Sequence, residues 1–124
     1  MKLGQERTAN PRRGLPTTNS WVTAFDPATG ELLMICDGTL PTMYRTAAAA
    51  AVSTKHLARN DAKTLTVIGA GQLGRQCLRA VRSMREFEQV FVYDIFQDAA
   101  QQLAEELSDR DEAPINVADA ATCW

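Results

Sequence analysis

The second half of the chain alternates short apolar runs with longer amphipathic segments. The run "TLTVI" at 64–68 comes directly before a glycine-rich turn and is typical of a buried strand in a parallel sheet. Apolar residues then recur at the helical period until another apolar run begins. The complete series predicts strands at 64–68, 89–94 and 114–117, with helices at 72–86 and 98–110 between them.

Each predicted helix has one apolar face that we expect to point toward the sheet. In the first helix this face comprises Leu73, Cys77, Leu78, Val81 and Met84. In the second helix it comprises Ala99 or Ala100, Leu103 and Leu107. The alternation of strands and helices predicts an α/β fold. The order β-α-β-α-β is one half of a doubly wound, Rossmann-type sheet.

The first half of the chain has a different pattern. Residues 1–19 are rich in arginine, proline, threonine and asparagine, and we expect them to be irregular or weakly extended. Two apolar and aromatic runs then flank "DPATG", which predicts a β-hairpin over 20–36. Five consecutive alanines favour a helix at 42–59 with Thr42 as its N-cap. The alanines fit close packing against a neighbour and a generic alanine-rich helix equally well.

Composition limits the classes of function to consider. The chain has 124 residues, of which 45% are apolar and 23% charged, enough for one globular core and hardly more. A formal net charge of −2 gives no reason to expect nucleic acid or an anionic membrane as a partner. No apolar run approaches the roughly 20 residues of a membrane span, and no secretory leader pattern is present, so we expect a cytoplasmic protein. Three cysteines without a CxxC pair and a single histidine predict no metal site and no Ser-His-Asp triad.

Glycines follow the first predicted parallel strand and open the helix after it. In this context Gly69 allows a tight turn, Gly71 lets a pyrophosphate approach the backbone, and Gly74 lets the helix lie close to the strand. The unpaired N–H groups and the positive dipole end of the helix suit phosphate. A GxGxxG motif alone is weak evidence. Its position between a strand and a helix predicts a dinucleotide-binding turn.

An acidic residue ends the second parallel strand. Asp94 lies 20 residues after Gly74, where a carboxylate accepts hydrogen bonds from the adenosine ribose and repels a 2′-phosphate. No lysine or arginine follows it closely, so the sequence favours NAD over NADP. The alternative is that Asp94 only begins a turn.

Basic residues form a stripe along the helix after the glycine turn. They are Arg75, Arg79, Arg82 and Arg85. The acidic residues nearby argue against a nucleic-acid surface, so we expect a solvated face. Arg75 is close enough to the turn to be considered for a phosphate contact.

The motifs of the two halves together resemble one known family. "DPATG", "DG", "RTAA" and "IGAG" occur in this order, and the series is similar to that of the ornithine cyclodeaminase and mu-crystallin family. The resemblance runs from Lys2 to about residue 119. It implies an NAD-dependent enzyme that transfers hydride at the Cα of an L-amino acid or its cyclic imine. It also implies a partial substrate and dimerisation domain at 1–60, a partial NAD-binding domain at 61–124, and a homodimer in the full-length protein.

The resemblance further implies roles for individual residues. Lys2 matches an active-site lysine that contacts the substrate carboxylate or assists proton transfer. Arg45 matches the arginine that binds the α-carboxylate, a contact for which a bidentate, always-charged guanidinium is suited. Without the resemblance, a solvated arginine in the first helical turn is the alternative. Thr17 matches a threonine that contacts the cofactor, and the backbone at Gln72 and Leu73 matches positions that meet the pyrophosphate.

Family members extend beyond this chain at both ends, so we expect a truncated fragment that is inactive alone. One half of the sheet leaves the nucleotide crevice without its opposite wall and an apolar edge open. The implied activity is that of an ornithine cyclodeaminase, which converts ornithine to proline and ammonia. Alternatives within the family are a ketimine or pyrroline-2-carboxylate reductase and an alanine dehydrogenase. A non-catalytic nucleotide-binding module and an interaction protein that pairs through its sheet edge are the alternatives outside it.

Overall fold

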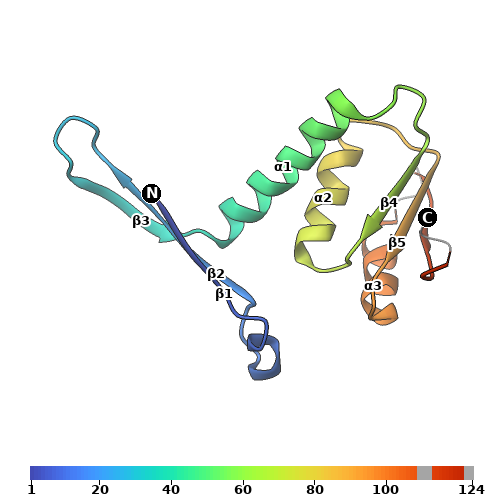
Figure 1. Ribbon diagram of the computed structural model, residues 1–124, viewed down its shortest axis with the longest axis horizontal. Helices are drawn as coiled ribbons and strands as arrows, with labels where there is room; N and C mark the ends of the chain where they lie inside the picture. Colours follow the sequence, from blue (N-terminus) through green and yellow to red (C-terminus); the bar gives the residue numbers. More distant parts are fainter. Residues whose placement is uncertain (109–112, 122–124) are drawn as a thin grey trace. The chain divides into compact units, whose positions relative to one another are not determined.

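A computed structural model describes residues 1–108 and 113–121 of the chain (Figure 1). The chain divides into two compact units, Met1–Tyr44 and Arg45–Trp124. The first unit contains an antiparallel sheet, and the second contains a parallel sheet. The division into units falls within a helix, and the domain bounds implied by the resemblance, 1–60 and 61–124, stay a prediction.

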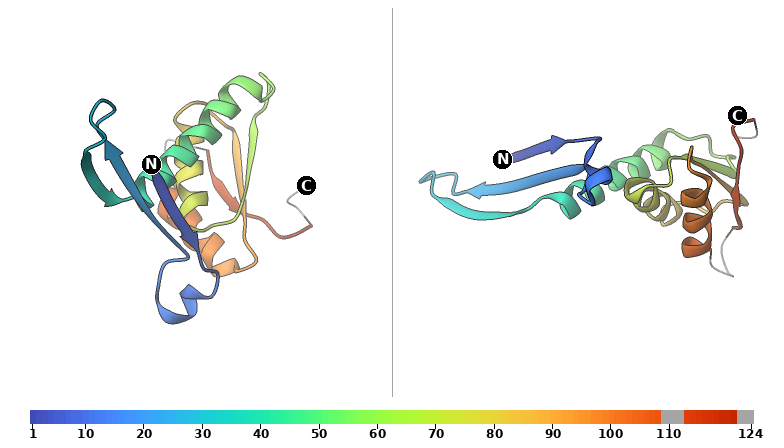
Figure 2. Two further views of the ribbon diagram at one scale, coloured as in Figure 1. Left: turned by 60° about the vertical axis from the view of Figure 1, so that its left-hand side comes forward. Right: turned by 90° about the horizontal axis from the view of Figure 1, so that it is seen from below.

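The antiparallel sheet has three strands in the order β1-β2-β3 (Figure 2). Their bounds are Lys2–Glu6 for β1, Thr18–Phe25 for β2 and Leu32–Asp37 for β3. Strands β2 and β3 form the predicted hairpin and extend slightly beyond it at both ends. In the turn, Asp26 Oδ1 accepts the N–H groups of Ala28 and Thr29 at 2.7 and 3.0 Å. The bond from the Thr29 N–H has the larger effect, and together the two bonds hold the pKa of Asp26 below its usual value.

The prediction that residues 1–19 are irregular or weakly extended is wrong. Strand β1 pairs with β2 over all five of its residues. A short 3-10 helix, η1 (Asn10–Arg13), follows and ends at Gly14, whose φ is 68°. The strand was missed because "KLGQE" is polar and lacks the apolar alternation of a half-buried strand. Backbone pairing with β2 makes it extended.

Helix α1 (Thr39–Leu57) begins three residues before the predicted start and ends two before the predicted end at 59. Thr42 is therefore not its N-cap, because the Thr42 N–H already donates to the Gly38 carbonyl at 2.9 Å. The helix begins earlier, and Asp37, two residues before Thr39, accepts the Thr39 N–H on its Oδ1 at 2.8 Å. The proline in the first turn does not interrupt the helix, because the N–H that it lacks would have no partner there.

The second unit contains the predicted Rossmann-type half. Its parallel strands lie in the order β4-β5-β6, with one helix in each crossover. The bounds are β4 Thr64–Ile68, α2 Gln72–Arg82, β5 Gln89–Tyr93, α3 Gln97–Leu107 and β6 Ile115–Val117. Both helices end before their predicted limits of 86 and 110, and residue 110 lies outside the described residues.

Both helices cover the same face of this sheet, because one buried cluster contains residues of α2, α3 and β5. The cluster comprises Ala70, Leu78, Val90, Val92, Ala100 and Leu103. The centres of the two predicted apolar faces are therefore confirmed. Leu73 and Met84 are 45% and 48% exposed, so the predicted face of α2 was too wide.

The prediction that β4 is fully buried is wrong. Leu65 and Val67 pack against the core, whereas Thr64, Thr66 and Ile68 are exposed. Within the described residues β4 is an edge strand, and helices cover only one face of the sheet. A central parallel strand is covered on both faces, and this difference explains the alternating exposure.

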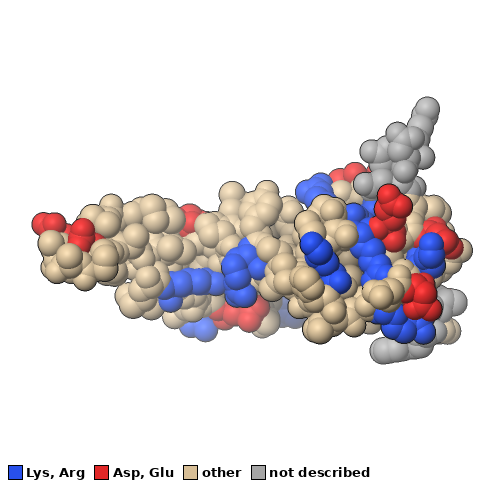
Figure 3. Space-filling model, turned by 90° about the horizontal axis from the view of Figure 1, so that it is seen from above, with Lys and Arg blue, Asp and Glu red and all other residues tan. Residues whose placement is uncertain are grey.

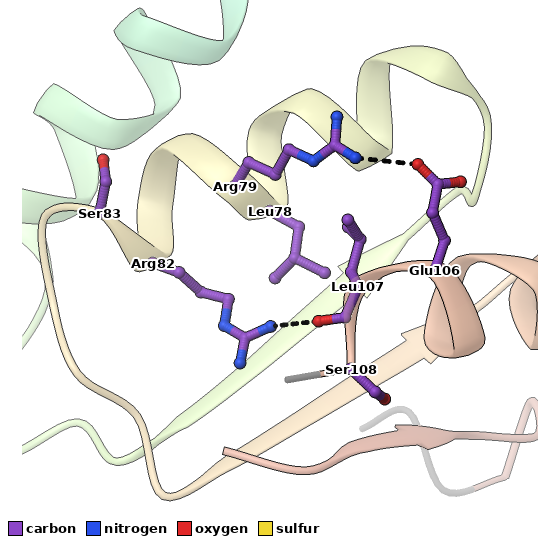
Figure 4. A pocket seen from close by; sticks show the side chains of 7 residues that line it. All are labelled: Leu78, Arg79, Arg82, Ser83, Glu106, Leu107 and Ser108. Atoms are coloured by element: carbon purple, nitrogen blue, oxygen red, sulfur yellow. Dashed lines mark hydrogen bonds and ion pairs between the residues drawn. The ribbon is translucent and has the colours of Figure 1, made fainter. Parts of the chain in front are cut away.

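The arginine stripe is not the solvated face that the sequence predicted. Arg75 and Arg79 of α2 both pair with Glu106 of α3. The pair of Arg79 and Glu106, at 2.9 Å, is drawn in Figure 4. Arg82 donates to the backbone carbonyls of Leu107 and Ala113, each at 3.1 Å. Spaced three or four residues apart, these arginines share one side of α2 and hold α3 against it.

We expect replacement of Glu106 by alanine to lower the free energy of unfolding by about 1 kcal/mol. Two guanidinium groups lose their shared carboxylate, but the partly exposed pairs are screened by solvent. Urea unfolding followed by circular dichroism measures the effect, which salt should reduce. Glu105→Ala is the matched control, because Glu105 contacts only Gln101 of its own helix among the bonds described. Equal losses in both variants would contradict the role of Glu106.

Candidate dinucleotide site

The glycine turn begins where β4 and β5 stop pairing. The last paired residues are Ile68 and Tyr93, and the Gly69 N–H extends the ladder by donating to the Tyr93 carbonyl at 2.8 Å. Gly69 has a φ of 102°, a conformation that only glycine adopts without strain. The chain therefore turns sharply off the sheet at the carboxyl end of β4, as the motif predicted.

Gly74 allows helix α2 to lie directly against this turn. A Cβ at Gly74 would overlap the carbonyl oxygen of Gly69 and would lie 3.0 Å from its carbonyl carbon. Those are backbone atoms, so they cannot move aside without distorting the turn. Close packing of helix and strand is the role that the motif assigns to its third glycine.

Gly71 has open space where a side chain would stand. It is the N-cap residue of α2, with φ −70° and ψ −177°, so its backbone does not itself require glycine. A Cβ built there meets no atom within 4 Å. No side chain caps the helix, so the first N–H groups of α2, including those of Gln72 and Leu73, face this space. The residues fit the pyrophosphate of a dinucleotide, because open backbone and helix N–H groups meet at one place.

Asp94 lies beside the glycine turn. Its Oδ2 accepts the Ala70 N–H at 2.7 Å, and its Oδ1 accepts the Phe96 N–H at 2.9 Å. The side chain is half-buried. The bond to Phe96 closes a short turn, as the alternative interpretation of Asp94 proposed. Asp94 therefore begins a turn and also lies at the candidate site.

The other residues that the resemblance singled out lie in different parts of the chain. Lys2 and Thr17 belong to the first unit, at opposite ends of the β1–β2 ladder. Lys2 is opposite Val22, whereas the Thr17 carbonyl accepts the Arg7 N–H at 2.8 Å. Five residue steps along β1 separate the two sites by about 17 Å. Arg45 is exposed in α1 and belongs to the second unit.

The helices α2 and α3 also border a pocket of about 310 Å³ (Figure 4). It is lined by Leu78, Arg79, Arg82, Ser83, Glu106, Leu107 and Ser108. These residues belong to the C-terminal halves of the helices, whereas the glycine turn is at the N-terminus of α2. Ligands of such sheets bind at the carboxyl ends of the strands, so this pocket is not the candidate site.

Four further observations bear on the chemistry of the chain. Burial raises the pKa of the Cys77 thiol, which fits a small apolar residue on a helix face rather than a nucleophile. Among residues 1–108 and 113–121, no three potential metal ligands cluster, and no helix is long and apolar enough to cross a membrane. On the face drawn in Figure 3, basic and acidic side chains are intermixed.

Sequence reasoning missed two contacts of this region. It did not find that Asp94 accepts the backbone N–H of Ala70, because the two residues are 24 positions apart and no local sequence pattern connects them. It also missed that Glu106 is the partner of the arginine stripe. The helical spacing of the arginines identified the face, but no local signal identified what covers it.

A parallel strand, a glycine turn, a helix N-terminus and an acidic residue after the next strand define a dinucleotide-binding half of the Rossmann type. The model of the ornithine cyclodeaminase/mu-crystallin family matches residues 1–122. The chain belongs to this family.

Individual relatives agree with this result. A Delta(1)-pyrroline-2-carboxylate reductase of Bacillus cereus is 38% identical over 101 residues, which cover 82% of this chain and 31% of the relative. The structure of the Thermococcus litoralis Delta(1)-pyrroline-2-carboxylate reductase with NADH and L-proline matches with a TM-score of 0.88 at 38% identity, over 97% of this chain and 37% of that one. An archaeal alanine dehydrogenase dimer with bound NAD matches with a TM-score of 0.89 at 31% identity, over 96% and 37%. The chain thus spans about a third of the length of these relatives.

We expect alanine at Gly74 to destabilise the chain much more than alanine at Gly71. The Gly74 Cβ overlaps backbone atoms of the turn, and the resulting strain and displacement should cost at least about 2 kcal/mol. Alanine at Gly71 meets open space at an ordinary φ and should change the free energy of unfolding by less than about 0.5 kcal/mol. Urea unfolding of both variants compares them. Equal stability would contradict the close packing of α2 on the turn.

Proposed function

We propose that the chain binds NAD or NADH at the glycine turn, and that the whole protein transfers hydride at the Cα of an amino acid or its imine. The observation that carries the proposal is the open backbone at Gly71 between a required glycine turn and the N-terminus of α2. Relatives at 38% and 31% identity are described with NADH or NAD bound, and this supports the same cofactor here.

The geometry of the second unit supports the proposed cofactor contacts. The backbone of Gly69, Gly71 and Gly74 lets the pyrophosphate come close, and the N–H groups of Gln72 and Leu73 donate to it. Asp94 then accepts hydrogen bonds from the adenosine ribose. Its negative charge disfavours a 2′-phosphate, so we propose a preference for NAD over NADP.

The remaining proposed contacts involve Arg45, Lys2 and Thr17. Arg45 would bind the α-carboxylate through two parallel hydrogen bonds and so fix the position of Cα. Lys2 would contact the same carboxylate or carry a proton to or from the substrate nitrogen, and Thr17 would contact the cofactor. When bound, the nicotinamide supplies or accepts the hydride. The roles of Lys2, Thr17 and Arg45 rest on the family motif.

Within the family we favour a reductase or dehydrogenase reaction, because the relatives above are a pyrroline-2-carboxylate reductase and an alanine dehydrogenase. A cyclodeaminase reaction, in which ornithine yields proline and ammonia, is the alternative and uses the same Cα chemistry. For these 124 residues the proposal is restricted to cofactor binding, since they match about a third of the relatives' length.

The assembly and location of the protein are also proposals. We propose a homodimer, supported by the alanine dehydrogenase relative, which is described as a dimer. A cytoplasmic location fits a nicotinamide-dependent enzyme of amino-acid metabolism. A non-catalytic nucleotide-binding module is the second candidate function. It is favoured by the one-sided sheet, in which the described residues supply a single half of the crevice.

We expect saturable binding of NADH to the purified chain, weaker binding of NADPH, and at least about tenfold weaker NADH binding by Gly71→Ala. The alanine methyl group would occupy the open space that the pyrophosphate needs. Isothermal titration calorimetry measures the binding, and circular dichroism confirms that each protein is folded. Unchanged NADH affinity in a folded Gly71→Ala variant would contradict the site, and absence of binding by the folded chain would contradict the proposal.

A further inference from the structure

We propose that Asp94 is also a positioning residue, whose carboxylate holds the glycine turn in shape before any nucleotide binds. The Asp94 bridge comprises this carboxylate and the N–H groups of Ala70 and Phe96 that donate to it. The bridge itself is independent of the cofactor. Its importance for nucleotide binding rests on the proposed function.

The bridge begins where the backbone ladder between β4 and β5 ends. Gly69 makes the last backbone bond, to the Tyr93 carbonyl, and its φ of 102° then turns the chain away from β5. The next N–H group, that of Ala70, can no longer reach a strand carbonyl in register. The Asp94 side chain accepts it instead at 2.7 Å.

Burial makes this bond important. Ala70 is 1% exposed and belongs to the core cluster, so water is not a ready substitute for its partner. A buried backbone N–H without an acceptor is strongly unfavourable. The position of the turn is therefore coupled to a side chain that stands 24 residues later in the sequence.

The second bond orients the carboxylate. The Phe96 N–H donates to Oδ1 at 2.9 Å, and Phe96 is the residue directly before α3. With one oxygen bound to the turn and the other to the start of α3, the side chain has a fixed orientation. A carboxylate has about four lone-pair sites, so two remain for the ribose hydroxyls. Substitutions at Asp94 should therefore alter the turn as well as the ribose contact.

Amide hydrogen exchange measured by NMR without nucleotide tests the bridge. In Asp94→Ala we expect the Ala70 amide to exchange at least about tenfold faster relative to the Val92 amide of the same core. The Ala70 and Phe96 amide protons should also move upfield, since each loses a charged acceptor. Asp98→Ala is the matched control, because it removes a carboxylate from the first turn of α3 and should leave the Ala70 amide unchanged.

Asp94→Asn provides a second variant if Asp94→Ala fails to fold. Its amide oxygen can accept one of the two bonds, so partial rescue of Ala70 protection, with an upfield shift from the weaker neutral acceptor, is expected. An unchanged Ala70 amide in either folded variant would overturn the bridge. Failure of the wild-type chain to bind NADH while Ala70 stays protected would overturn the proposed function alone.

Discussion

The contact of Gly74 with the Gly69 carbonyl is the constraint on which the candidate site depends. The two glycines have different requirements, since Gly69 needs a positive φ and Gly74 needs the absence of a Cβ. Together they bring the N-terminus of α2 against the end of β4. The helix N–H groups and the open backbone of Gly71 then face the same space. The steric requirements of these two glycines thus contribute to a site with the geometry for phosphate.

Long-range polar contacts hold the elements around this turn. Arg75 and Arg79 connect α2 to Glu106 of α3, and Asp94 connects the turn to the residue before α3. Both links therefore join the two crossovers of one β-α-β-α-β unit. The apolar cluster packs both helices on the sheet, and the polar links add specific contacts between the two crossovers.

The sequence predicted the second unit well because each signal was local. Apolar runs marked β4 and β5, helical spacing marked α2 and α3, and the glycines marked the turn between them. It predicted the first unit less well. Strand β1 is polar and forms only by pairing with β2, and α1 begins three residues before the expected threonine, where Asp37 accepts the Thr39 N–H.

The partners of charged side chains were the least predictable feature. Helical spacing showed that the arginines share a face but could not show that Glu106 covers it, and the Asp94 bond to Ala70 depends on how two strands end. Lys2, Thr17 and Arg45 were assigned from the family motif. Lys2 and Thr17 lie at opposite ends of one ladder, and no local pattern in the sequence connects either of them with Arg45.

The central claim is that a dinucleotide binds at the carboxyl end of β4. An amide NMR map of the ¹⁵N-labelled chain during NADH titration tests it most directly, because it reports where the ligand binds. The account predicts that the largest shifts occur at residues 69–74 and at Asp94, with little change around Ser83 and Ser108 at the far ends of α2 and α3. Shifts confined to the pocket between those far ends, or none in a folded chain, would contradict it.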